Sequence, residues 1–215
     1  ETLSRIQHPR VASVMDADVM GARPYIVTRF VPGPSLDEVV TRSGPLDPNA
    51  LVRVARGLAD AVQAIHEKGV IHRDIKPGNV LLEEGEPVLI DFGIAHLEDD
   101  VRVTQAGLVM GTPGYLSPEL VEGGAITDAT DWWAWAATIV FAASGRPPFG
   151  RGPMRGVLSR VRAGDVDVRG IDPLLVPLLQ AALSPEPLER PSATQVVHAL
   201  ERYAAGKSAR VAQPA

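Results

Sequence analysis

Apolar positions along this chain follow helical spacing in some stretches and form short strand-like runs in others. The first long helix is predicted from Asp47, a favourable N-cap followed by Pro48, to a stop at Gly69. Its apolar residues recur every three or four positions and form one face of about five turns. That face consists of Leu51, Val54, Leu58, Val62 and Ile65.

Four short apolar runs predict β-strands. Residues 11–15 and 25–31 flank a polar, glycine-containing stretch, and residues 80–82 and 88–90 flank EEGEP, so each pair is expected to form a hairpin. Two strands alone are marginally stable in water, so the first hairpin needs more sheet or a supporting domain. The segment VPGPS, residues 31–35, is the expected boundary between two lobes.

The second half of the chain is predicted to be mainly helical. Residues 132–143 are uncharged and apolar on every face, which is typical of a central buried helix. Further helices are expected at 154–161 and 174–183, and a last one opens with a capping box between Ser192 and Gln195. Residues 94–130 are polar and aperiodic, as in a long functional loop, and residues 204–215 are expected to form a disordered tail.

Composition limits the classes of partner and the cellular compartment that we expect for this chain. The net charge of -5, without a run of Lys or Arg, gives no electrostatic footprint for nucleic acid. The chain has no cysteine, which excludes disulfides and cysteine-ligated zinc and agrees with a cytoplasmic location. No apolar stretch reaches the roughly 20 residues of a membrane span, and the first residues carry no secretory signal. We therefore expect a cytoplasmic domain, in a parent protein that could itself be membrane-anchored.

The strongest chemical signal lies in HRDIKPGN, residues 72–79, and DFG, residues 91–93. These segments space a carboxylate, a lysine, an amide and a second carboxylate: Asp74, Lys76, Asn79 and Asp91. The hairpin predicted between them brings the two carboxylates close together. Carboxylate and amide oxygens suit magnesium, and a lysine suits a phosphate, so the pattern indicates phosphoryl transfer from a magnesium nucleotide.

With three further motifs, this pattern resembles the eukaryotic-type serine/threonine protein kinases that bacteria also carry. The further motifs are GTPGYLSPE at 111–119, Asp131 at the start of the central helix, and ERP at 189–191, all in the family's order. The resemblance implies an α+β, protein-kinase-like fold. Residues 1–31 are then the end of a regulatory helix and a remnant of the antiparallel N-lobe sheet, and residues 32–203 are a mainly helical C-lobe.

The resemblance also implies a reaction and its participants. ATP and Mg²⁺, with Mn²⁺ as a substitute, are the expected cofactors, and protein serine or threonine hydroxyls are the expected acceptors, including those of an autophosphorylation partner. No glycine-rich phosphate loop and no strand lysine precede the catalytic motifs in this sequence. The fragment by itself is therefore expected to bind ATP weakly and to transfer little phosphate.

By resemblance, five residues carry the chemistry. Asp74 orients the acceptor hydroxyl and takes its proton, Lys76 contacts the γ-phosphate, and Thr112 bridges these two. Asn79 and Asp91 are the implied magnesium ligands.

Three residues are expected around adenine and two in regulation. The Arg29 carbonyl and the Val31 backbone would pair with the base, and Leu81 would form its floor. Arg73 would receive a phosphate carried by Thr104.

Other residues are expected to hold the architecture. Glu119 and Arg190 would form a buried ion pair, and Asp131 would cap the central helix and accept N–H groups from the HRD loop. His72 is expected to pack beneath Phe92 and to take no part in the chemistry.

Two alternatives remain open. The first is a catalytically inactive kinase-like module that binds partners, although such a module has no physical need for all four polar groups of the two motifs. The second is a small-molecule phosphotransferase, which would lack GTPGYLSPE and the pairing of Glu119 with Arg190.

Overall fold

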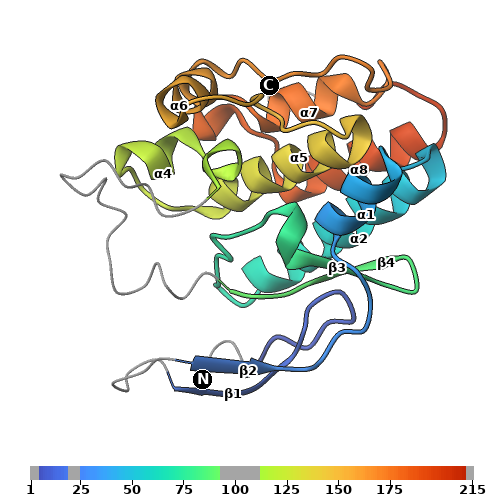
Figure 1. Ribbon diagram of the computed structural model, residues 1–215, viewed down its shortest axis with the longest axis vertical. Helices are drawn as coiled ribbons and strands as arrows, with labels where there is room; N and C mark the ends of the chain where they lie inside the picture. Colours follow the sequence, from blue (N-terminus) through green and yellow to red (C-terminus); the bar gives the residue numbers. More distant parts are fainter. Residues whose placement is uncertain (1–4, 19–24, 93–111, 212–215) are drawn as a thin grey trace.

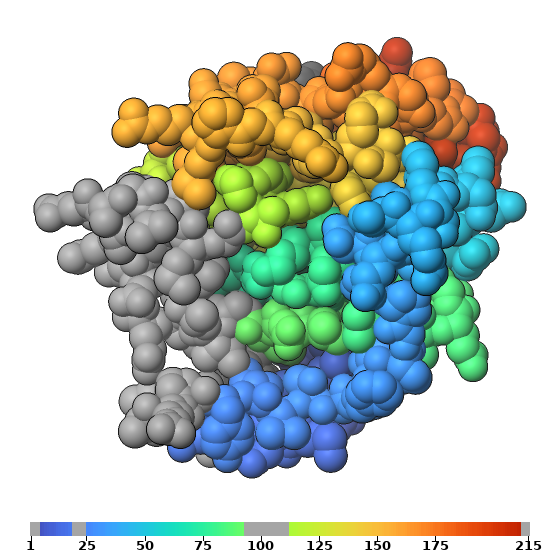
Figure 2. Space-filling view, viewed as in Figure 1, coloured from blue at the N-terminus to red at the C-terminus, as the bar shows by residue number. Residues whose placement is uncertain are grey.

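The computed structural model describes residues 5–18, 25–92 and 112–211. Figure 1 shows the helices gathered in one lobe, with two small β-hairpins layered beneath it. Figure 2 shows the blue segment after the first hairpin running up one side of the molecule to reach the helical lobe. This arrangement confirms the predicted α+β fold, with a mainly helical lobe and a small remnant of antiparallel sheet.

Each hairpin is a two-stranded antiparallel sheet. Strands β1 (Val14–Asp18) and β2 (Tyr25–Thr28) form the lower one, and β3 (Val80–Glu83) and β4 (Glu86–Leu89) form the upper one. The first strand was expected to begin at Val11. Instead, Val11 forms a parallel bridge with Leu89, because residues 11 and 12 run along β4 before β1 begins.

The hinge, residues 29–35 between β2 and α1, lies against β3. The Leu82 N–H donates to the Pro34 carbonyl at 2.9 Å, and Ser35 forms a bridge with Leu81. Gly33 has a φ of 133°, and a Cβ there would meet the Leu82 carbonyl oxygen at 2.3 Å. Only glycine fits this approach. Helix α1 (Leu36–Ser43) follows at once, capped by Ser35.

Two helices form the centre of the helical lobe. Helix α2 (Pro48–His66) is amphipathic and capped by Asp47, as its apolar spacing predicts. Helix α5 (Asp128–Ser144) is buried on nearly every face and contains the three tryptophans of the chain. All three lie in the core, with exposed fractions of 3% or less. The remaining elements surround this pair: η2 (Pro77–Asn79), η3 (Pro113–Tyr115), α4 (Pro118–Glu122), α6 (Met154–Ala163), α7 (Val176–Ala182), η4 (Pro187–Glu189) and α8 (Ala193–Ala204).

The end of the chain corrects one expectation. The sequence predicted disorder from residue 204, but residues 205–211 continue from α8 and pack against the helical lobe. The Ala209 side chain is fully buried, and its N–H donates to the Leu174 carbonyl at 2.8 Å. Arg202 also donates to the Ser208 carbonyl, at 3.0 Å. Backbone hydrogen bonds and the burial of Ala209 therefore order a segment whose sequence shows no apolar periodicity.

Within the described residues, no helix is long and apolar enough to span a membrane.

Candidate functional site

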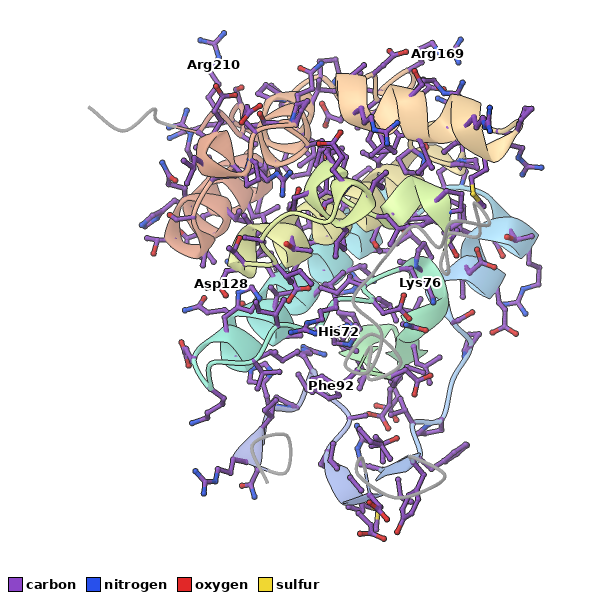
Figure 3. All side chains as sticks on the ribbon, turned by 90° about the vertical axis from the view of Figure 1, so that its left-hand side faces the viewer. His72, Lys76, Phe92, Asp128, Arg169 and Arg210 are labelled. Carbon is purple, nitrogen blue, oxygen red and sulfur yellow. The ribbon has the colours of Figure 1, made fainter. Side chains whose placement is uncertain are left out.

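Asp74, Lys76 and Asn79 meet in the loop between α2 and β3. Lys76 Nζ donates to both carboxylate oxygens of Asp74, at 2.7 and 2.9 Å. Asn79 Nδ2 donates at 2.8 Å to the Asp74 carboxylate and at 2.8 Å to its carbonyl. The Asp74 and Lys76 side chains are 25% and 28% exposed, so a ligand can reach both. Figure 3 places Lys76 between the helical lobe and the lower hairpin.

Asp131 holds the backbone of this loop. Its carboxylate accepts from the N–H of His72 at 2.7 Å and from the N–H of Arg73 at 2.9 Å. Because Asp131 is fully buried on the central helix, it fixes the loop to the core. The expectation that it also caps this helix is wrong. The helix begins at Asp128, three residues earlier, and its N-cap is Thr127.

His72 hydrogen-bonds to the backbone around the catalytic loop and packs against Phe92. Its Nδ1 accepts from the Asp74 N–H at 3.3 Å, so Nε2 carries the proton that is donated to the Ile90 carbonyl at 3.1 Å. Its ring lies 5.0 Å from that of Phe92 (Figure 3). Burial lowers the pKa of His72 below its usual value, which outweighs the opposing effect of Asp131. The residue is therefore a neutral packing group.

Asp91 lies next to Asn79 through the backbone. The Ile90 N–H donates to the Asn79 carbonyl at 2.9 Å, and Asp91 follows Ile90 directly in the chain. Asp91 is exposed and has a φ of 54°, a left-handed conformation uncommon for a residue with a side chain. Because Nδ2 of Asn79 is held by Asp74, its Oδ1 is left to act as a ligand. Two oxygen donors of this kind fit a hard divalent cation.

An apolar cluster lies between the two hairpins at the predicted adenine edge. Val31, Ala12 and Val88 are buried there, and Leu81 and Ile90 pack against them half-buried. Predominantly apolar walls with a few backbone polar groups are typical of nucleotide base pockets. Val31 and Leu81, both expected at this edge, thus share one cluster.

The Arg29 side chain makes an ion pair that the sequence did not predict. Its guanidinium donates to both carboxylate oxygens of Glu83 on β3, at 2.9 and 3.2 Å. The two side chains are 37% and 30% exposed. The Arg29 N–H donates to the Ser13 carbonyl at 2.9 Å. Arg29, whose carbonyl is expected to face adenine, is therefore held by its side chain at Glu83 and by its backbone N–H at Ser13.

The structure describes one of the two threonines that were predicted to act at the site. Thr104 lies outside the described residues. Thr112 is exposed at the start of η3, and among described residues it makes no side-chain hydrogen bond to Asp74 or Lys76. Arg73, the expected phosphate receptor, is half-buried with a φ of 71°.

Glu119 of α4 and Arg190 after η4 form a buried bidentate ion pair. The two N–O distances are both 2.7 Å, and the side chains are 8% and 0% exposed. Arg190 also donates to three backbone carbonyls and lies 4.9 Å over the ring of Trp133. Burial by itself raises the pKa of Glu119, but Arg190 overcomes this effect and leaves that pKa below its usual value.

His66 is a further participant, to which the sequence pattern assigns no role. It lies at the end of α2, and its Nε2 is 2.8 Å from the Asp131 carboxylate. Asp131 is thus shared between the catalytic loop and α2. His66 and Asp131 are 65 positions apart, so no local pattern in the sequence could pair them.

Comparison with known proteins identifies the family of the chain. Residues 1–200 match the protein kinase domain family. Relatives include the serine/threonine-protein kinase AfsK of Streptomyces coelicolor, 41% identical over 84% of the chain, and PkaA of the same organism, 37% identical over 95%. A probable serine/threonine-protein kinase of Thermomonospora curvata, PkwA, is 35% identical over 92%. The chain covers 23%, 38% and 26% of these three proteins respectively, so it spans well under half the length of each. The chain belongs to the protein kinase domain family.

Proposed function

We propose that the protein containing this chain transfers the γ-phosphoryl group of ATP to serine and threonine hydroxyls of other proteins. The observation that carries the proposal is the Asp74 carboxylate, held at its two oxygens by Lys76 and Asn79. A base fixed in this way is oriented before the acceptor arrives, which removes part of the entropic cost of the reaction. The names of the relatives support the same acceptor class.

Asp74 is the group that receives the hydroxyl proton. As the acceptor oxygen bonds to the γ-phosphorus, the bond to the leaving ADP breaks, and the hydroxyl proton passes to the Asp74 carboxylate. A positioned base of this kind typically contributes about 10²–10⁴-fold in rate. Lys76 holds Asp74 in place and brings a positive charge to the oxygens of the transferred group, where charge accumulates.

Protein kinases in general use ATP and Mg²⁺. In this chain Asn79 and Asp91 would hold the metal through their oxygens, and the metal would neutralise phosphate charge. The Arg29 and Val31 backbone would contact the adenine edge, above the half-buried Leu81. Thr112 would approach Asp74 and Lys76 when an acceptor is bound.

Regulation is proposed to act through Arg73 and Thr104. A phosphate on Thr104 would pair with the Arg73 guanidinium through charge-assisted hydrogen bonds. Replacement of Thr104 by alanine should then lower activity, and phosphopeptide mapping of the active protein should find Thr104 modified. An unmodified Thr104 in fully active protein would refute this part of the proposal.

A transfer assay with radiolabelled ATP on the full-length protein tests the reaction, with Asp74→Asn as the control. Label on a protein serine or threonine, lost in the control, supports the proposal. Label on a small amine or alcohol would indicate a small-molecule phosphotransferase. Absence of label with intact folding would indicate a binding module.

A further inference from the structure

The segment around α6 departs from the charge of the rest of the chain. Residues 146–170 contain six arginines and two aspartates, with no lysine or glutamate, which gives them a net charge of +4. The whole chain carries -5, so the other residues together carry -9. A basic segment on an otherwise acidic protein is an electrostatic feature that can select partners.

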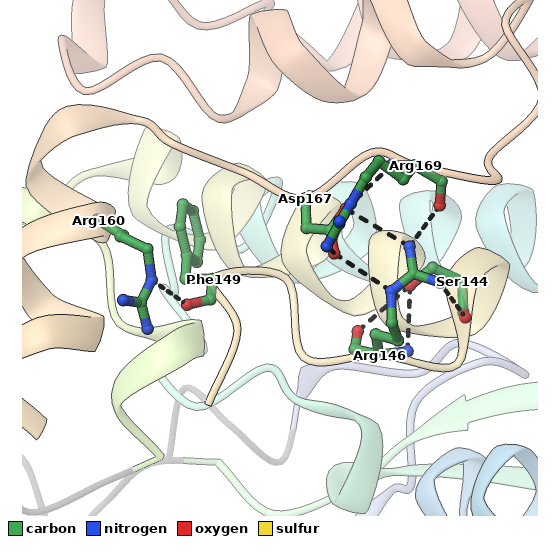
Figure 4. A network of polar contacts seen from close by, with 6 residues as sticks. All are labelled: Ser144, Arg146, Phe149, Arg160, Asp167 and Arg169. Carbon is green, nitrogen blue, oxygen red and sulfur yellow. Dashed lines mark hydrogen bonds and ion pairs between the residues drawn. The ribbon is translucent and has the colours of Figure 1, made fainter. Parts of the chain in front are cut away.

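One of these arginines fixes the loop before α6. Arg160 Nε donates to the Phe149 carbonyl at 2.6 Å (Figure 4). Its Nη2 donates to the Arg151 carbonyl at 3.1 Å. The Phe149 ring stacks on Trp133, with centroids 5.5 Å apart. The backbone that carries Arg151 is therefore anchored to the core.

Two other arginines neutralise the nearby aspartate. Arg146 and Arg169 both donate to the Asp167 carboxylate, and Arg146 also donates to the Arg169 carbonyl (Figure 4). Hydrogen bonds from Arg169 and then from Arg146 hold the pKa of Asp167 well below its usual range. This carboxylate is thus already paired and does not cancel the remaining positive charge.

Arg151 and Arg155 remain unpaired within the described part of the chain. Both are exposed, and neither side chain forms a hydrogen bond or ion pair there. Arg155 begins an exposed face of α6 that continues through Ser159 to Arg162, which pairs with Glu122 of α4 at 3.1 Å. We call Arg151, Arg155 and Arg162 the α6 arginine surface. Figure 2 shows orange side chains of this part of the chain projecting from the upper edge of the molecule.

This surface adjoins η3 and α4, which follow Thr112 in the chain. Helix α6 packs against η3 and α4. Its Leu158 is buried with Leu116, Leu120 and Val121 of that region. In Figure 3, α6 lies on the same side of the helical lobe as Lys76. A partner bound at α6 would therefore lie on the same side of the helical lobe as the catalytic loop.

We infer that the α6 arginine surface binds an acidic segment of the protein substrate. The inference rests on the proposed function and names a class of acceptor for it: proteins that carry a run of Asp or Glu outside the phosphorylated residue. Guanidinium groups pair with carboxylates through two parallel hydrogen bonds, and Arg151 and Arg155 have no such partner among the described residues. Docking at a second place raises the effective concentration of the acceptor hydroxyl at Asp74.

Peptide binding to the full-length protein can be measured without any phosphoryl transfer. The probe is a fluorescein-labelled peptide with one serine and a run of glutamates, compared with the same peptide carrying glutamines. The test variant is Arg151→Glu with Arg155→Glu. The matched control is Arg53→Glu with Arg56→Glu on α2, where both arginines are also exposed and unpaired among described residues. It changes the net charge equally.

We expect the α6 variant to bind the glutamate peptide about tenfold more weakly at low salt, because it loses a few exposed charge contacts. The α2 variant should bind this peptide with almost unchanged affinity. The effect should shrink as salt shortens the screening length. Equal weakening by both variants, or equal binding of the glutamine peptide, would overturn the inference. So would an oligonucleotide that binds as tightly and responds to the same variant.

Steady-state kinetics on the full-length protein then separate this inference from the proposed function. The α6 variant should raise KM for the glutamate peptide and leave kcat and the glutamine peptide unchanged. Transfer to both peptides at equal rates, in both proteins, would refute docking while the kinase activity stands. Peptide binding without any transfer would retain the α6 arginine surface as a docking site for acidic segments and refute the proposed reaction.

Discussion

The ion pair between Glu119 and Arg190 makes a quantitative prediction about stability. Replacing Arg190 by alanine leaves a carboxylate that is 8% exposed without its partner, and it also removes the donor to three backbone carbonyls. Breaking one side of such a buried pair costs about 3–5 kcal/mol. With a urea dependence of about 2 kcal/mol per molar, the unfolding midpoint should fall by about 2 M.

An exposed pair in the same lobe provides the matched control. Arg162 and Glu122 lie 3.1 Å apart, and their side chains are 51% and 57% exposed. Replacing Arg162 by alanine should cost about 1 kcal/mol or less, because water screens the pair. Urea unfolding of both variants, followed by circular dichroism, measures the difference. If Arg190→Ala is no more destabilising than Arg162→Ala, burial does not strengthen this pair and the reasoning fails.

The pH dependence of the free energy of unfolding in the acid range tests the same ion pair. Because Arg190 keeps the pKa of Glu119 below its usual value, the folded protein holds this carboxyl ionised where the unfolded chain is already protonated. The contribution is therefore complete above the unfolded carboxyl pKa of about 4.3 and is lost as the pH falls through the folded value. The difference between wild type and Arg190→Ala should narrow below pH ~4. A constant difference across that range would contradict the assigned charge.

Three further predictions concern the loop and the hinge. Asp131→Ala should speed hydrogen exchange of the His72 amide and lower the free energy of unfolding by about 2–5 kcal/mol, because two backbone N–H groups lose their acceptor. An unchanged exchange rate would refute this. Burial lowers the pKa of His72, so stability should fall by up to ~1.4 kcal/mol per pH unit below pH ~6.5; thermal unfolding of His72→Gln should lack this slope. Gly33→Ala should cost ~1–3 kcal/mol more than Gly44→Ala, because only the first Cβ meets another atom within 4 Å; equal costs in urea unfolding would contradict this.

Local signals in the sequence account for the long helices and the catalytic loop. Helix α2 was predicted because its apolar face repeats at helical spacing behind an Asp47 cap. The capping box at Ser192 marked the start of α8, and the structure shows it. Asp74, Lys76 and Asn79 lie within six residues of one another, so a single loop was sufficient to bring them together.

Features that depend on tertiary contacts were missed. Arg29 and Glu83 are 54 positions apart, and His66 and Asp131 are 65 apart, so nothing local pairs them. Helix α4 has only five residues, too few to show a period, and it was included in an aperiodic loop. The segment around Ala209 became ordered by docking against another loop and not by its own pattern.

The central claim is that Asp74 acts as the base in phosphoryl transfer to a protein hydroxyl. Its most direct test is single-turnover transfer from ATP by the full-length protein, compared with Asp74→Asn, with ATP binding measured in parallel. We predict phosphoserine or phosphothreonine as the product, a rate about 10²–10⁴-fold lower in the variant, and similar ATP affinity in both. An equal rate in the variant, or no phosphorylated protein from a folded enzyme that binds ATP, would contradict the account.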